Sequence, residues 1–112
     1  MKKSNKEKKE CLPCEGISSK LSPSEVNKNF KELKRWKLTR NYRLTKKYTF
    51  KDFKSALAFV NKVGEIADRE NHHPDIELGW GKVQLMIYTH ALAGLSMNDF
   101  ILASKIDKIS KK

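Results

Sequence analysis

Residues 76–89 read Ile-Glu-Leu-Gly-Trp-Gly-Lys-Val-Gln-Leu-Met-Ile-Tyr-Thr, and this stretch decides the fold. Its second half alternates, and the aliphatic members of the alternation are Val83, Leu85 and Ile87. A period of two places such a row on one face of a β-strand. Gly81-Lys82 is typical of a tight connection, so we expect strands over 76–80 and 83–89. Because the link is short, the two strands should pair antiparallel.

Upstream, residues 22–25 carry the signals of a helix start. Ser22 can cap the helix, Pro23 suits its first position, and Glu25 can reach back to complete a capping box. Apolar residues follow at helical spacing, namely Val26, Phe30 and Leu33. These signals predict a first helix that runs to about Lys34.

Two further strands are expected before the next helix. The first is short, over residues 36–38, and Arg40-Asn41 favours a turn after it. Apolar and polar residues then alternate over residues 42–50, with Lys46 as the one interruption. This period of two predicts a second, longer strand.

Two more helices complete the pattern. An apolar stripe at helical spacing predicts the longest helix over residues 52–69. A second capping-box pattern, Ser96-Met97-Asn98-Asp99, starts a last helix. The order is therefore helix, two strands, helix, two strands, helix, which predicts an α+β two-layer sandwich.

Composition points to one globular domain with a basic surface. The chain has 112 residues and a formal net charge of +11 at pH 7. We assign residues 1–20 to a flexible basic leader and residues 21–110 to the domain. The charge favours acidic partners, although lysine-rich chain ends are more often solvated tails than binding arms. No apolar run approaches the roughly 20 residues that span a bilayer, so we expect a cytoplasmic protein.

Cys11 and Cys14 form a Cys-x-x-Cys pair near the start of the chain. Such a pair can be half of a zinc site or a redox centre. A second pair of cysteines is absent from the sequence, and no βαβ pattern surrounds this one. In a reducing compartment we expect two free thiols.

All three histidines fall between residues 72 and 90, as His72-His73-Pro74 and Thr89-His90. The unperturbed pKa of histidine, about 6.5, allows proton transfer near neutrality. Pro74 disfavours helix at His73, so the pair should lie where a helix gives way to extended chain. This grouping predicts a proton-transfer site.

The residues around the histidines form an ordered set of motifs. The set comprises Glu70-Asn71-His72-His73-Pro74-Asp75-Ile76, Trp80-Gly81-Lys82-Val83, Tyr88-Thr89-His90, Gly94-Leu95-Ser96, Asp99-Phe100 and Leu102-Ala103-Ser104-Lys105-Ile106. It closely resembles the pterin-4a-carbinolamine dehydratases, also known as dimerisation cofactors of a liver homeodomain transcription factor. A thinner likeness extends back to Cys11, so the resemblance covers about residues 11 to 107.

The resemblance implies a four-stranded antiparallel sheet with three helices packed on one face. It also implies a hydro-lyase reaction, in which a 4a-hydroxytetrahydropterin loses water to become a quinonoid dihydropterin during tetrahydrobiopterin recycling. His72, His73 and His90 match the family's three active-site histidines. By this likeness His72 and His90 are acid–base groups near the 4a carbon, and His73 binds and orients the pterin. No metal or other cofactor is implied.

The resemblance also suggests residues that bind the substrate, namely Trp36, Asp68, Asn71, Thr89 and Asp99. Some of these have simpler interpretations. Asp99 is also explained as a capping residue of the last helix, and the two roles are compatible. Trp36 opens a strand, where an aromatic side chain is more often part of the core.

Two interpretations of the histidines compete with catalysis. Three imidazoles could bind zinc, but adjacent histidines are awkward ligands for one ion. Each histidine taken alone could equally be a surface or capping residue. The surrounding match favours catalysis.

The expected partners are a pterin substrate, further copies of the chain in a homodimer or homotetramer, and a functional link to an aromatic amino acid hydroxylase. No specific nucleic acid and no membrane are expected. The alternative function is non-catalytic, as a protein-binding, assembly or coactivator-like member of the same family. A third possibility is nucleic-acid binding through the basic surface, for which the sequence has no recognisable motif.

Overall fold

The computed structural model describes residues 21–92 and 94–110 of the chain. Its elements, in order, are α1 (Pro23–Phe30), β1 (Lys37–Leu38), β2 (Leu44–Thr49), α2 (Phe53–Glu70), β3 (Asp75–Gly79), β4 (Lys82–Ile87), the short 3-10 helix η3 (His90–Leu92) and α3 (Met97–Ser110). The leader and the Cys11/Cys14 pair lie outside the described residues.

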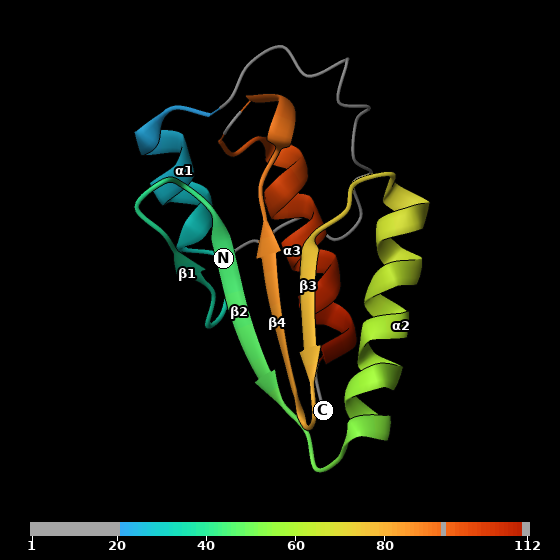
Figure 1. Ribbon diagram of the computed structural model, residues 1–112. Helices are drawn as coiled ribbons and strands as arrows, with labels where there is room; N and C mark the ends of the chain where they lie inside the picture. Colours follow the sequence, from blue (N-terminus) through green and yellow to red (C-terminus); the bar gives the residue numbers. More distant parts are fainter. Residues whose placement is uncertain (1–20, 93, 111–112) are drawn as a thin grey trace.

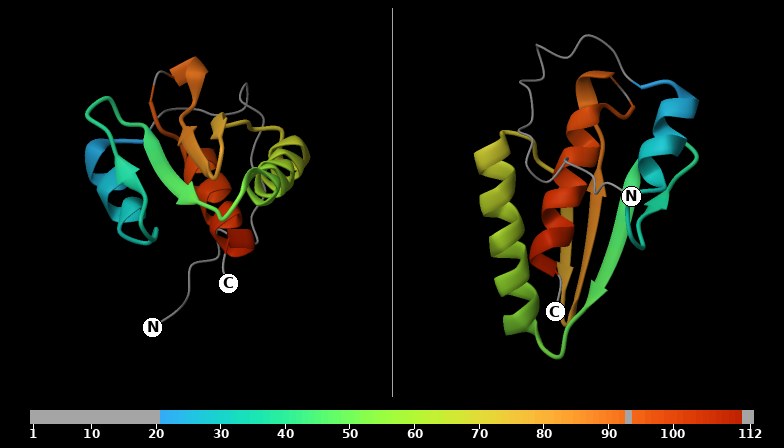
Figure 2. Two further views of the ribbon diagram at one scale, coloured as in Figure 1. Left: turned by 60° about the horizontal axis from the view of Figure 1, so that its bottom comes forward. Right: turned by 180° about the vertical axis from the view of Figure 1, so that it is seen from behind.

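The four strands form one antiparallel sheet in the order β1-β2-β4-β3. β4 lies between its neighbours, with Leu85 opposite Lys46 of β2 and Ile76 of β3. All three α-helices cover the same face of this sheet, and none of the α-helices among the described residues lies on the other face (Figures 1 and 2). The predicted α+β two-layer sandwich is confirmed.

The alternation in β4 builds the core. Val83, Leu85 and Ile87 are essentially fully buried beneath the helices. Apolar residues of all three helices pack against this row, among them Val26, Phe59, Val63, Phe100 and Ile106. Because the opposite face of β4 carries the intervening residues, the strand divides the protein into an apolar layer and an open face.

Helix α1 is shorter than the predicted helix, which was expected to reach Lys34. It ends at Phe30, and the amide groups of Glu32 and Leu33 bond three residues back, as in a tightening last turn. Arg35 then takes a positive φ of 66°. The chain must reverse here to bring β1 alongside β2, and this long-range requirement ends the helix.

The second strand also starts later than predicted. Tyr42 has a φ of 58° and donates its amide hydrogen to the carbonyl of Thr39, so it belongs to the turn between β1 and β2. The Thr39 hydroxyl accepts the amide hydrogen of Arg43 across the same turn. Extended backbone begins at Leu44.

Within the described ranges, no helix has both the length and the apolar character needed to cross a membrane.

Candidate active site

The end of helix α2 places the histidine pair. Asn71 takes the left-handed conformation, with φ 54° and ψ 41°, and donates its amide hydrogen to the carbonyls of Ala67 and Asp68. The next amide, of His72, also bonds to Ala67. This is the Schellman arrangement that closes a helix, and asparagine is one of the few residues that adopt it readily. The sharp exit separates the directions of the two imidazoles.

His72 points into the protein. Its side chain is 5% exposed, and its Nε2 lies 2.6 Å from Oδ1 of Asp99. The Asp99 side chain is 0% exposed. A buried carboxylate this close to an imidazole fixes the orientation of the ring and favours one tautomer.

The other oxygen of Asp99 is held by two residues of the segment between β4 and α3. Oδ2 accepts hydrogen bonds from the Thr89 hydroxyl at 2.7 Å and from the Ser96 amide at 2.8 Å. The hydroxyls of Thr89 and Ser96 also contact each other at 2.9 Å. Asp99 therefore both caps the start of α3 and holds His72.

The hydrogen-bond pattern around Asp99 determines which ring nitrogen of His72 is available. An ionised carboxylate only accepts hydrogen bonds, so the proton in the 2.6 Å contact belongs to Nε2. In neutral imidazole the second nitrogen, Nδ1, is then an acceptor. We infer that Nδ1 is the atom through which His72 would exchange a proton.

His73 lies on the surface instead. Its Nε2 is 2.9 Å from Oδ1 of Asp68, one helical turn back on α2. The two side chains are 56% and 83% exposed. Solvent weakens such a pair to at most about 1 kcal/mol, so the contact orients His73 without locking it.

His90 is positioned by an aromatic neighbour that the sequence interpretation did not single out. Its ring stacks on Tyr88, with centroids 4.2 Å apart and an angle of 20° between the planes. The guanidinium of Arg43 lies 4.0 Å from the centroid of the same tyrosine ring. Tyr88 precedes His90 by two residues, but β4 ends at Ile87 and His90 begins η3, so the period of the strand does not account for the stack. The contribution of Arg43, from β2's side of the sheet, had no local signal.

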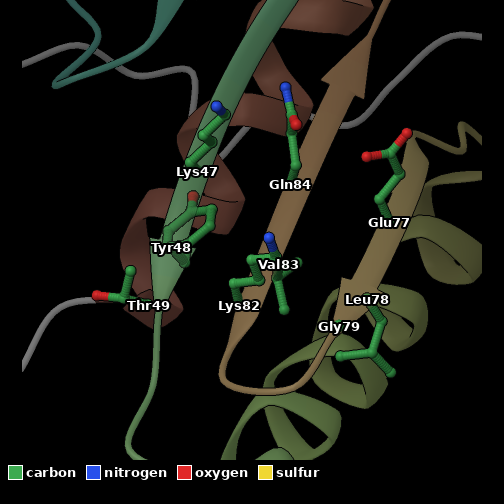
Figure 3. Close-up of a pocket in the computed structure, with 9 residues that line it drawn as sticks. All are labelled: Lys47, Tyr48, Thr49, Glu77, Leu78, Gly79, Lys82, Val83 and Gln84. Carbon is green, nitrogen blue, oxygen red and sulfur yellow. The ribbon is translucent and has the colours of Figure 1, made fainter.

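The three histidines line one open depression of about 420 Å³, together with Asn71, Asp75 and Tyr88. A second hollow of about 270 Å³ lies lower on the open face of the sheet, lined by residues that include Lys47, Glu77 and Gln84 (Figure 3). The second hollow has no histidine. Because acid–base groups gather at the first, we take that depression as the candidate active site.

The residues suggested as substrate ligands fall into three groups. Asn71 lines the depression, and Asp68 holds His73 at its edge. Thr89 and Asp99 are buried behind His72, where they position the imidazole. Trp36 is in the core, is not among the residues that line the depression, and donates its indole hydrogen to Asp107 at 2.8 Å.

The zinc interpretation finds no supporting geometry in the described ranges. Across residues 21–92 and 94–110, no group of three or more His, Cys, Asp or Glu side chains gathers in a way that could hold a metal ion.

The chain was also compared with known proteins. The sequence profile of the family described as pterin 4 alpha carbinolamine dehydratase matches residues 19–109. A protein of Rubrobacter xylanophilus with the provisional name pterin-4-alpha-carbinolamine dehydratase is 40% identical over 101 residues, which are 90% of this chain and 94% of that protein. A protein of Chlorobaculum tepidum with the same provisional name is 41% identical over 106 residues, covering 92% and 96% of the two chains.

Solved structures show the same architecture. A crystal structure described as a transcriptional coactivator/pterin dehydratase from Brucella melitensis superposes with a TM-score of 0.78 at 26% identity, covering 83% of this chain and all of that one. A pterin dehydratase-like protein described as a RuBisCO assembly factor matches with a TM-score of 0.60 at 17% identity, over 70% of this chain and 93% of that one, a likeness of fold alone. Sequence and fold agree, and the chain belongs to the pterin 4 alpha carbinolamine dehydratase family.

Proposed function

We propose that this protein dehydrates 4a-hydroxytetrahydrobiopterin to quinonoid dihydropterin and water, as a step of tetrahydrobiopterin recycling. The observation that carries the proposal is the convergence of three imidazoles on one depression, with His72 held at 2.6 Å by the buried carboxylate of Asp99. Family membership supplies the class of substrate. The geometry supplies groups that can move protons near neutral pH.

The reaction needs two proton movements. The hydroxyl on carbon 4a leaves as water after receiving a proton. Ring nitrogen 5 loses its proton as a double bond forms between carbon 4a and nitrogen 5. Two imidazoles in opposite protonation states can divide these tasks, and positioned acid–base catalysis contributes about 10² to 10⁴ in rate. We assign the tasks to His72 and His90, and the binding of the pterin ring to His73.

The two acid–base histidines differ in their surroundings. His72 is buried and its ring is fixed by Asp99, so it can present Nδ1 in a constant direction. His90 is exposed and stacked on Tyr88, so solvent can reload it with a proton between turnovers. A fixed and a solvent-connected imidazole on one depression suit a cycle that takes up one proton and releases another.

The non-catalytic alternative fits this site less well. A member that served only as a binding or assembly protein would have no use for a buried carboxylate that orients an imidazole. Here Thr89, Ser96 and Asp99 are all buried and bonded to maintain that orientation.

The proposal is tested by following dehydration of 4a-hydroxytetrahydrobiopterin generated in situ by an aromatic amino acid hydroxylase. Wild-type protein should accelerate the reaction, and His72→Ala and His90→Ala should each lose about 10² or more of that acceleration while remaining folded. Lys62→Ala, an exposed change on α2, is the matched control and should keep full activity. A folded wild-type protein that gives no acceleration would refute the proposal.

We also propose that the protein forms a homodimer or homotetramer. In support, α2 exposes Phe53 and Leu57 one turn apart, 43% and 39% accessible, and Trp80 is 72% exposed. Large apolar side chains that are exposed in this way can mark surfaces that contact another protein. Sedimentation equilibrium would give a single monomer mass if the proposal were wrong.

A further inference from the structure

The excess positive charge of the described residues is concentrated in one part of the chain. Residues 28–47 hold nine basic residues against one acid, Glu32, a net charge of +8. The nine are Lys28, Lys31, Lys34, Arg35, Lys37, Arg40, Arg43, Lys46 and Lys47. Residues 48–110 hold seven basic and eight acidic residues, a net charge of −1. The charge is therefore segregated, and the leader does not account for all of it.

The fold gathers this segment at one edge of the sheet. Helix α1, strand β1 and the turn into β2 lie together there, away from α2 and β3 (Figures 1 and 2). Two of the nine cations are partly buried and have partners within the protein. Lys46 forms an ion pair with Asp107, and Arg43 lies over the ring of Tyr88. The other seven are exposed. Six of them form what we call the basic edge, namely Lys28, Lys31, Lys34, Arg35, Lys37 and Arg40, whereas Lys47 lines the hollow of Figure 3.

Structural roles explain only part of the basic edge. A lysine on a short outer strand such as β1 discourages pairing with other chains, which suits Lys37. A lysine in the last turn of α1 favours the helix dipole, which suits Lys28. Neither role calls for six exposed cations across a helix, a turn and a hairpin. Crowded like charges also repel one another, so an anionic partner would relieve a cost that the fold carries.

Tyr42 adds an aromatic group at the tip of this edge. It is 39% exposed and lies in the β1–β2 turn with a positive φ of 58°, next to Arg43 and two residues from Arg40. Exposed aromatic rings beside arginines are the usual platform on which unpaired bases stack. The other large apolar side chains that the described residues expose, Phe53, Leu57 and Trp80, belong to α2 and the β3–β4 turn. A membrane surface would need a broad exposed apolar face beside the charges, and within residues 28–47 of the described chain Tyr42 is the one large apolar side chain that is exposed.

We propose that the basic edge binds single-stranded nucleic acid without sequence preference. The lysines and arginines contact backbone phosphates, and the ring of Tyr42 stacks on a base. Contacts to phosphates position a strand but carry no sequence information, so the expected absence of a specific nucleic-acid partner still holds. This binding uses none of the residues of the candidate active site and stands apart from the dehydratase proposal.

The test is fluorescence anisotropy of the full chain with a labelled single-stranded RNA of about 20 nucleotides, over a range of salt concentrations. One variant reverses four charges of the basic edge, Lys28→Glu, Lys31→Glu, Arg35→Glu and Lys37→Glu. The matched control reverses four exposed lysines elsewhere, Lys51→Glu, Lys54→Glu, Lys62→Glu and Lys108→Glu. Both carry the same net charge and keep the same termini.

Wild type should bind at low salt. A plot of the logarithm of its association constant against the logarithm of the salt concentration should have a slope of about −0.7 for each phosphate contact. The basic-edge variant should bind roughly tenfold or more weakly and with a shallower slope, while the control stays within about threefold of wild type. Tyr42→Ala should weaken binding at salt concentrations where the phosphate contacts are already screened, because stacking depends little on salt.

Three results would overturn the proposal. Wild type could fail to bind at low salt, or the two four-residue variants could lose affinity equally, which would assign the binding to overall charge or to the termini. Vesicles containing phosphatidylserine could also compete better than RNA, which would identify a membrane surface instead. If circular dichroism shows that the basic-edge variant is unfolded, glutamine in place of glutamate in both four-residue variants gives the same charge-matched comparison.

Discussion

The side chains of His72 and Asp99 are 27 positions apart in the sequence and meet at 2.6 Å in the interior. The contact joins the end of α2 to the start of α3, so the packing of these two helices sets the direction of the imidazole. Thr89 and Ser96 hold the carboxylate from its other side. The core of the protein thus supports the candidate site directly, and disturbance of one should be measurable in the other.

Replacing Thr89 with valine should destabilise the protein by about 1–3 kcal/mol, because Asp99 loses a buried donor. The free energy of unfolding in urea measures this effect. Thr49→Val is the matched control, an exposed threonine on β2 whose replacement should change stability by no more than about 0.5 kcal/mol. Equal effects of the two substitutions would show that the Thr89 hydroxyl does not support Asp99.

Tyr88 should act on catalysis through His90. Tyr88→Phe keeps the stacked ring and should leave kcat/KM within about twofold, whereas Tyr88→Ala removes the ring and should lower it by about tenfold to a hundredfold. Proton exchange rates and chemical shifts of the His90 ring report whether its orientation is lost at the same time. If the alanine variant kept full kcat/KM, the stack would have no part in positioning His90.

A substitution of Trp36 tests whether this residue contacts the pterin. Its indole donates to the carboxylate of Asp107, and a hydrogen bond to a charged group is worth about 1.5–3 kcal/mol. Trp36→Phe should therefore lower stability by that order and leave the KM for the pterin unchanged. A raised KM with unchanged stability would instead support contact with the substrate.

Asp52 should give a pH-dependent contribution to stability. The carboxylate of Asp52 accepts a hydrogen bond from the Ser55 amide at 2.8 Å. This bond is the main cause that lowers the pKa of Asp52 below the usual 3.8, and the positive charge of Lys51 lowers it further. A lowered pKa in the folded state stabilises the protein fully above the unfolded pKa, and this contribution is lost as the pH falls through the folded pKa.

The matched variant is Asp52→Asn, which can still cap α2 but carries no charge. Wild type should melt at a higher temperature than this variant at neutral pH, and the difference should shrink as the solution is acidified through the pKa of Asp52. A difference in melting temperature that stays constant with pH would show that the charge of Asp52 does not contribute to stability.

Much of the fold was predictable because its signals are local. The alternation of Val83, Leu85 and Ile87 gave the buried face of β4, and the box of Ser22 and Glu25 is formed as expected, with both of its hydrogen bonds. Such patterns depend on neighbours within four residues, which the sequence displays. The ends of α1 and β2 were predicted less well, because Arg35 and Tyr42 take positive φ values to suit distant packing.

The candidate site was also predictable only in part. The grouping of the three histidines was visible in the sequence, and the depression that they share agrees with it. The bond between His72 and Asp99 and the stack of Arg43 on Tyr88 join distant parts of the chain. Neither has a periodic signature, so only the folded structure reveals which histidine is fixed and which is exposed.

The most direct test of this account is the rate of 4a-hydroxytetrahydrobiopterin dehydration by Asp99→Asn. Asparagine keeps the shape of the side chain, but it can turn an N–H group toward Nε2 of His72 and so favour the wrong tautomer. We expect a folded protein whose kcat falls by about a hundredfold or more, with nitrogen chemical shifts that show the proton moved to Nδ1. A folded Asp99→Asn protein with the wild-type kcat would contradict it.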